Sequence, residues 1–95
     1  MVVVLIKLPV NYNVLDWKER RDVRNQYVSV QNGKCYHCQQ PLTIRPVQNR
    51  KIEWKAFPPN FLKNPIHLHH NHNTGMTIGA VHAYCNAVLW QYYGE

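Results

Sequence analysis

The stretch that decides the fold of this chain reads His67-Leu68-His69-His70-Asn71-His72-Asn73-Thr74-Gly75, and it is followed by His82-Ala83-Tyr84-Cys85-Asn86. Five of the six histidines of the chain lie between positions 67 and 82. A further fragment, Cys35-Tyr36-His37-Cys38, lies upstream. Together these fragments offer ligands for two kinds of metal site: a closed site for structural zinc, and an open site of histidine and asparagine suited to phosphodiester chemistry.

The closed site is indicated by two pairs of ligands with the same short spacing. Cys35 and Cys38 form the first pair, and His82 and Cys85 form the second. Structural zinc takes four thiolate and imidazole ligands in such pairs, and no cysteine of the chain is left over. We therefore expect a structural Zn²⁺ at these four residues. His37 is the rival for His82, but ligation from between two ligating cysteines would be strained, and a redox dithiol would call for a βαβ context that this sequence lacks.

Around these ligands the sequence predicts a small α+β domain. The expected elements are an apolar strand at 2–8, a helix at 16–31, a zinc-knuckle turn at 35–41, strands at 66–70 and 76–81 with a turn between them, and a helix from about 82 to 94. Residues 42–66 carry weaker signals. Thr43-Ile44 and 51–54 are candidates for short strands, whereas the prolines at 58–59 and 65 indicate loops.

The helix at 16–31 is marked at both ends. Asp16 and Glu19 match a capping box, and Asn32-Gly33 supplies a left-handed stop. The apolar residues that fall roughly on one face of this helix are Trp17, Val23, Tyr27 and Val30. The basic residues on the rest of its surface are Lys18, Arg20, Arg21 and Arg24. For this basic surface, simple solvation and contact with phosphate are both open.

The charge of the chain indicates a polyanionic partner. The 95 residues carry a formal charge of +6, and the sequence pI is near 9.5. After Asp22 the only acidic residues are Glu53 and Glu95. A solvated basic surface is the plainer interpretation, and nucleic acid is the favoured one. A single domain of this length buries a modest core, so a metal that staples the fold together is also expected.

The cysteines and the N-terminus indicate the compartment. Three cysteines cannot all pair within one chain, and the Cys35–Cys38 spacing suits a metal better than a disulfide, which points to reducing surroundings. Residues 1–6 are apolar, but they are too short for a signal peptide core or a membrane span. We expect a cytoplasmic protein of a bacterial host cell with no membrane partner, and the minimal size favours a phage or mobile-element origin.

The fragments at 35–38, 69–75 and 82–86 together resemble an HNH endonuclease of the ββα-metal (His-Me finger) class, in particular its recombination endonuclease VII-like branch. That branch carries Cys-x-x-Cys, then an acidic residue, His, x, His, x, Thr, Gly, and then Cys-x-x-Cys-Asn. The resemblance covers about residues 35–90, and nothing before position 30 contributes to it. The Thr74-Gly75 turn and the Cys85-Asn86 pair make it more specific than a histidine cluster alone.

The resemblance implies a single nuclease domain over 1–95, with an N-terminal strand and basic helix at 1–33 and a zinc-bound ββα-metal core at 35–90. It implies that His70 is the general base that activates water, and that His72 lines the active site. Asn86 falls on a ligand of the catalytic divalent metal. His69 falls where the family has an aspartate that also binds this metal, and His82 replaces a zinc-binding cysteine.

The missing aspartate bears on the choice of metal. A site made of His69 and Asn86 has no formal charge, and Mg²⁺ prefers oxygen ligands. We therefore expect Mn²⁺, Co²⁺ or Ni²⁺ to serve better than Mg²⁺. His67 is expected to face solvent or to be satisfied in the core.

The function implied by the resemblance is hydrolysis of DNA phosphodiester bonds, either by nicking or by double-strand cleavage, for which a homodimer is one route. The alternative is a non-catalytic, zinc-bound nucleic-acid-binding module. A third interpretation, a basic protein that inhibits another protein, would leave the histidine cluster without a role.

Overall fold

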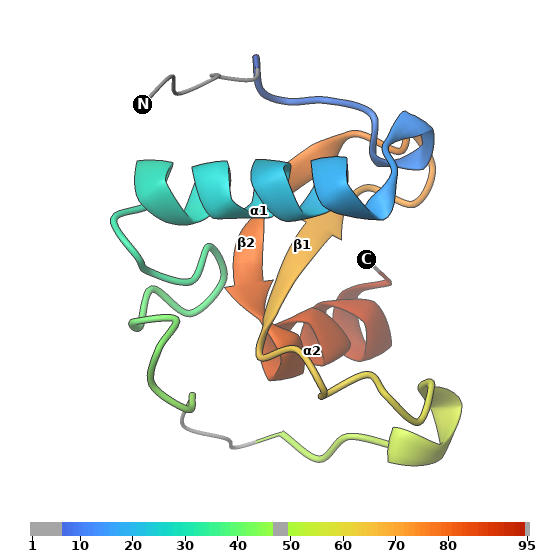
Figure 1. Ribbon diagram of the computed structural model, residues 1–95. Coiled ribbons are helices and arrows are strands. Elements are labelled where there is room, and N and C mark those ends of the chain that lie inside the picture. The colour runs from blue at the N-terminus through green and yellow to red at the C-terminus, as the bar shows by residue number, and fades with distance from the viewer. Residues whose placement is uncertain (1–6, 47–49, 95) are drawn as a thin grey trace.

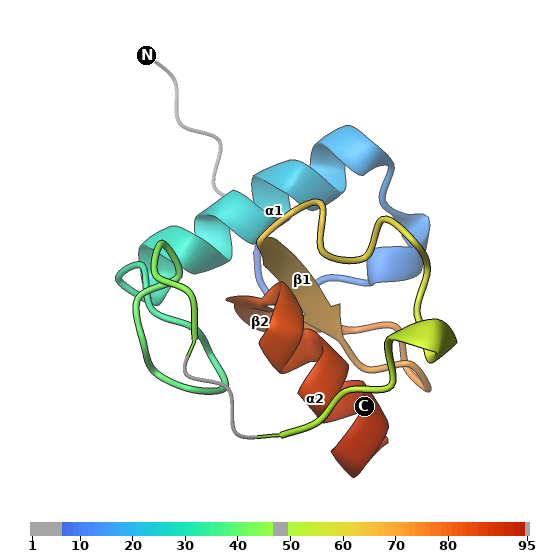
Figure 2. The ribbon, with the colours of Figure 1, turned by 90° about the horizontal axis from the view of Figure 1, so that it is seen from below.

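A two-stranded hairpin packs between two helices in the computed structural model, which describes residues 7–46 and 50–94 (Figure 1). The main elements are α1 (Trp17–Val30), β1 (Ile66–His70), β2 (Thr77–His82) and α2 (Ala83–Tyr93), with short 3-10 helices at Tyr12–Val14 and Trp54–Ala56. The helix α1 contacts one side of the antiparallel pair, and α2 crosses the other side (Figure 2). The predicted α+β class is confirmed. None of the helices in the described ranges is long and apolar enough to cross a membrane.

Both predicted ends of α1 are confirmed. The Asp16 side chain accepts a hydrogen bond from the Glu19 backbone N–H at 2.8 Å, and Glu19 accepts one in return at 3.1 Å. This reciprocal capping satisfies two donors that the first turn of a helix leaves unpaired. The helix ends where Asn32 and Gly33 adopt positive φ angles of 58° and 73°.

The buried face of α1 is narrower than the sequence pattern predicted. Val23 and Tyr27 are buried in the main core, together with Leu42 and Val81 from the knuckle loop and β2. Trp17 and Val30, at the two ends of the helix, are each 68% exposed. The apolar residues of the helix therefore do not form one continuous buried face, because the short hairpin covers only the middle of the helix.

The hairpin has the predicted strands, and its register is interrupted once. Ile66 pairs with His82 and His69 pairs with Gly79, and the register shifts between His69 and His70. The side chains of residues 66–69 therefore alternate between the two faces of the hairpin, as in a regular strand. The side chain of His70 does not continue this alternation.

The segment before α1 braces the hairpin turn. The backbone N–H of Tyr12 donates to the Gly75 carbonyl at 2.7 Å, and that of Thr77 donates to the Val10 carbonyl at 2.8 Å. The Thr77 hydroxyl also contacts the Tyr27 hydroxyl at 2.9 Å. These bonds fix the 3-10 segment against the end of β1, so Tyr12 lies beside His70.

The outer side of β2 is bonded by side-chain and loop groups. The Gln31 amide accepts from the Ala80 N–H at 2.9 Å and donates to the Ala80 carbonyl at 2.9 Å. The Tyr36 N–H donates to the same carbonyl at 2.9 Å. The end of α1 and the knuckle are thereby attached to β2.

The two short strands that the sequence suggested at residues 43–44 and 51–54 are absent from the described residues. Residues 43–44 form a turn, and the segment after residue 50 leads into the 3-10 helix Trp54–Ala56. Neither segment has a partner strand there, so β-branched side chains alone do not make a strand. The strand expected at 2–8 lies largely outside the described residues, since these begin at Lys7.

Gly75 provides a test of the bracing contacts. Its φ is +79°, and an added Cβ would lie 2.6 Å from both Asn11 Oδ1 and Asn13 Nδ2. We expect Gly75→Ala to lower the free energy of unfolding by about 2 kcal/mol or more, measured by urea denaturation. Gly33→Ala is the matched control, because Gly33 has φ +73° and nothing within 4 Å of an added Cβ. An equal loss in both variants would mean that the contacts around Gly75 contribute nothing.

Candidate metal centre and adjoining hollow

The four predicted zinc ligands come together at one point. Cys35, Cys38, His82 and Cys85 each offer one ligand atom, and these atoms all lie within 4.8 Å of one another. The knuckle is closed by hydrogen bonds between the backbones of Cys35 and Gln40 at 2.9 Å and of Gln39 and Cys35 at 3.0 Å. The four residues are positioned to hold a metal ion such as zinc. His37, the rival ligand, is exposed and lies outside the group.

The imidazole of His82 is oriented by backbone groups. Its Nδ1 lies 3.4 Å from Cys38 Sγ and 3.6 Å from Cys85 Sγ. Its Nε2 lies 2.9 Å from the carbonyl oxygens of Pro41 and Ile44, so Nε2–H donates to them. A metal-ligating histidine usually donates its other ring N–H in this way, so Nδ1, which faces the two sulfur atoms, is the nitrogen left to bind a metal.

The close approach of the sulfur atoms separates their acidities. A hydrogen bond from the Cys85 thiol lowers the pKa of Cys35 to about 4. The same bond, with burial and the neighbouring thiolate, raises the pKa of Cys85 above its ordinary value. A metal cation bound to these four residues would take the place of the shared proton and would favour the thiolate form of Cys85.

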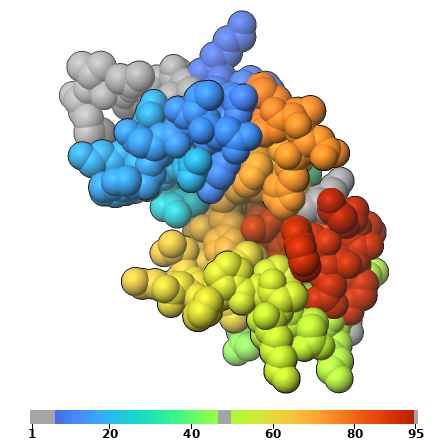
Figure 3. All heavy atoms as spheres, turned by 90° about the vertical axis from the view of Figure 1, so that its right-hand side faces the viewer, coloured from blue at the N-terminus to red at the C-terminus, as the bar shows by residue number. Residues whose placement is uncertain are grey.

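A separate hollow of about 430 Å³ lies between α1, the outer edge of β1 and the start of α2. It is lined by Tyr12, Trp17, Arg20, Arg21, Arg24, Phe61, Asn64, Ile66, His67, Leu68, His70 and Asn86. Figure 3 looks at the side of the molecule where the blue chain around the start of α1 and the yellow chain before β1 border a recess. The sequence-predicted residues His70 and Asn86 thus share one surface with three arginines.

His70 is held by a ring stack. Its imidazole lies parallel to the Tyr12 ring, with centroids 3.9 Å apart and planes 6° apart. The Arg20 guanidinium lies 3.8 Å from the same Tyr12 ring, and its Nε donates to the Tyr12 carbonyl at 3.2 Å. Two groups at such distances cannot share one face of a ring, so Tyr12 lies between Arg20 and His70. Burial lowers the pKa of His70, and the nearby His72, His69 and Arg20 lower it further.

Asn86 contacts His67, a residue to which the sequence analysis assigned no role in the site. Its amide nitrogen lies 3.1 Å from Nδ1 of His67. The His67 ring also packs edge-on against Phe61, with centroids 4.6 Å apart, and burial lowers its pKa. Strand alternation was the available signal, because His67 lies two residues before His69 and therefore on the same face of β1.

The other two predicted histidines are placed differently. His69 is 2% exposed and is not among the residues that line the hollow. His72 is exposed in the turn, with its ring centroid 4.9 Å from that of His70. Within the described residues, the β1 histidines do not form a second cluster of three or more His, Cys, Asp or Glu with metal-like spacing.

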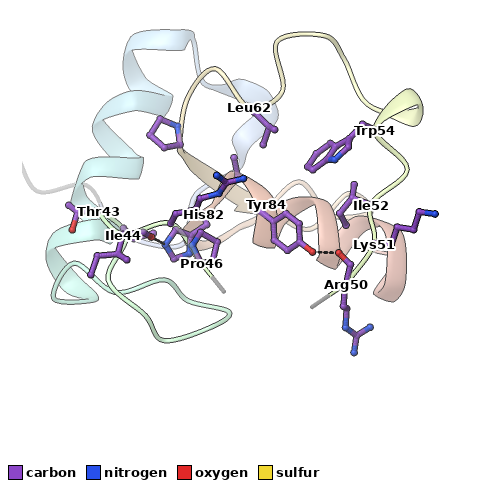
Figure 4. A pocket seen from close by; sticks show the side chains of 14 residues that line it. Thr43, Ile44, Pro46, Arg50, Lys51, Ile52, Trp54, Leu62, His82 and Tyr84 are labelled. Carbon is purple, nitrogen blue, oxygen red and sulfur yellow. Dashed lines mark hydrogen bonds between the residues drawn. The ribbon is translucent and has the colours of Figure 1, made fainter. Parts of the chain in front are cut away.

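A larger cavity of about 700 Å³ is lined in part by His82 (Figure 4). Its walls include Ile44, Ile52, Trp54 and Tyr84, and the Tyr84 hydroxyl donates to the Arg50 carbonyl. Among the described residues that line it, the only histidine is His82, which already belongs to the metal centre. The cavity therefore adds no ligand or base to the site.

No protein-family model matches this chain, and comparisons with curated proteins and with solved structures found no match.

Proposed function

We propose that this chain is a metal-dependent DNA endonuclease of the HNH type, with β1, β2 and α2 as its ββα-metal unit. The observation that carries the proposal is the shared hollow: a half-buried histidine base candidate, a histidine–asparagine pair and three arginines line the same space. A zinc-stapled fold alone has no need of His70 and Asn86 at such a surface.

In this proposal His70 removes a proton from the attacking water. Its lowered pKa keeps the imidazole neutral near pH 7, as a base requires. The stack with Tyr12 fixes the plane of the ring, so its nitrogen is presented in one orientation. In-line attack of the water would leave a 5′ phosphate and a 3′ hydroxyl.

In this proposal the catalytic divalent ion would be held by His69 and Asn86, the two ligands that the family resemblance implies. His67 lies on the same face of β1 as His69 and lines the hollow with Asn86, whereas His69 is buried and does not line it. Asn86 contributes its amide oxygen, and His67 is already 3.1 Å from the amide group. Such an ion would stabilise the charge that develops on the leaving 3′ oxygen. The arginines of α1 would hold the DNA backbone without reading sequence.

The test is a plasmid nicking assay with each divalent metal added in turn. We expect Mn²⁺, Co²⁺ or Ni²⁺ to support nicking at a concentration about tenfold lower than Mg²⁺, because imidazole ligands favour borderline ions. His69→Asp should move the preference toward Mg²⁺. Circular dichroism of this variant checks its fold, because His69 is buried. Best activity with Mg²⁺ in the wild type and an unchanged preference in the variant would show that His69 is not a ligand.

The second candidate is a non-catalytic, zinc-bound nucleic-acid-binding module. The arginines that line the hollow favour it as much as they favour the enzyme. Binding of DNA without nicking under any of these metals would select this candidate.

A further inference from the structure

One stripe of α1 faces the hollow rather than the core. The stripe consists of Trp17, Arg20, Arg21 and Arg24, and all four residues line the hollow. They are spaced at i, i+3, i+4 and i+7, so they share one side of the helix. The buried side is a different one, which carries Val23 and Tyr27. The stripe combines one large aromatic ring with three cationic groups beside the candidate catalytic residues.

Trp17 is placed as a surface for stacking. Trp17 is 68% exposed, although indole is among the largest apolar side chains. The Nζ of Lys18 lies 5.5 Å from the ring centroid, and the Cζ of Arg21 lies 5.7 Å from it. An exposed ring with cations around it is the combination that binds single-stranded nucleic acid, in which bases stack and phosphates pair with charge.

The charge of the hollow fits a polyanion. None of the described residues that line it is acidic. Arg21 makes an exposed ion pair with Asp22 at 3.5 Å, which contributes little in water. Arg20 is held by Tyr12, so its guanidinium is fixed above the hollow without an acidic partner in that contact.

We propose that this stripe binds a DNA strand with unpaired bases, with Arg20 and Arg24 on its phosphates and Trp17 stacked on one base. An indole can cover the face of a base only where that base has left the duplex stack. The preferred substrate is therefore a single-stranded segment. The position of this strand next to the scissile phosphate rests on the proposed nuclease function, whereas the binding itself does not.

The experiment measures fluorescence anisotropy with a fluorescein-labelled dT12 strand and with a labelled 12-base-pair duplex. The protein carries zinc and His70→Ala, and no other divalent metal is added, so cleavage cannot interfere. We expect tighter binding to dT12 than to the duplex. Trp17→Leu should weaken dT12 binding about tenfold and duplex binding less than about twofold, whereas Trp17→Phe should restore most of the loss.

The arginines are tested with a matched pair. Arg24→Gln should weaken binding of both DNAs and reduce the slope of log affinity against log salt by about one. Arg45→Gln removes the same charge from an exposed arginine that does not line the hollow and should change the slope less. Circular dichroism confirms that each variant is folded.

The outcomes separate this inference from the nuclease proposal. Equal losses for dT12 and duplex in Trp17→Leu, no loss at all, or tighter binding of duplex by the parent protein would each overturn it. If the wild type does not nick DNA but Trp17 still governs dT12 binding, the strand-binding surface stands and the nuclease proposal fails.

Discussion

Replacing Cys38 or Cys85 with serine will unfold this domain. The metal centre joins the knuckle loop, the end of β2 and the first turn of α2. Two of its cysteines, Cys35 and Cys85, are also members of the main core. Zinc binding in small structural sites contributes on the order of 10 kcal/mol, which is comparable to the whole stability of a small domain.

The measurement is far-UV circular dichroism during heating, combined with metal content by mass spectrometry. We expect one zinc per wild-type chain, and we expect the serine variants to lose both the metal and the cooperative transition. His37→Ala is the control, because His37 lies between the knuckle cysteines but is exposed and outside the ligand group. The His37→Ala variant should keep both the bound zinc and the cooperative thermal transition. A wild-type protein that is stably folded without zinc would contradict this prediction.

The second large effect is expected from His70→Ala. If His70 is the base, its loss should lower the rate of nicking by about 10²- to 10⁴-fold while DNA affinity stays almost unchanged. Burial lowers the pKa of His70, so the imidazole stays unprotonated at pH values where a free histidine is already half charged. The wild-type rate should therefore persist as the pH falls through 6.5 and decline only at lower pH.

His37→Ala again provides a control, since it removes an exposed imidazole from the knuckle. It should nick at the wild-type rate. A His70→Ala enzyme with undiminished nicking would show that another group activates the water, and His72 would be the next candidate because its ring lies 4.9 Å from that of His70.

The parts of the fold that the sequence predicted are those determined locally. The capping box of α1, the left-handed stop after it and the spacing within each pair of zinc ligands all involve residues close together in the chain. The limits of β1 were predicted correctly because neighbouring residues determine the turn that follows it. In this turn the Asn71 side chain accepts hydrogen bonds from the N–H groups of Asn73 and Thr74 at 2.8 and 3.0 Å.

The parts that the sequence did not predict depend on contacts between distant segments. Trp17 has the spacing of a core residue, and only the length of the hairpin decides that it lies beyond the core. The contact between His67 and Asn86 joins β1 to α2 over 19 positions. The Tyr12–His70 stack joins the hollow to a segment outside the family resemblance, so no motif could indicate it.

The bonds along β2 have a further consequence, which concerns self-association. A hairpin of two strands has exposed edges. The unpaired N–H and carbonyl groups of such an edge can bond to a strand of another molecule, and this pairing leads to aggregation. Here Gln31 and Tyr36 bond to Ala80, and Val10 bonds to Thr77. A second molecule would have to displace these groups before it could extend the sheet at β2. In this chain the edge of β2 is therefore bonded by the Gln31 side chain and by the backbones of Tyr36 and Val10, rather than by a third strand.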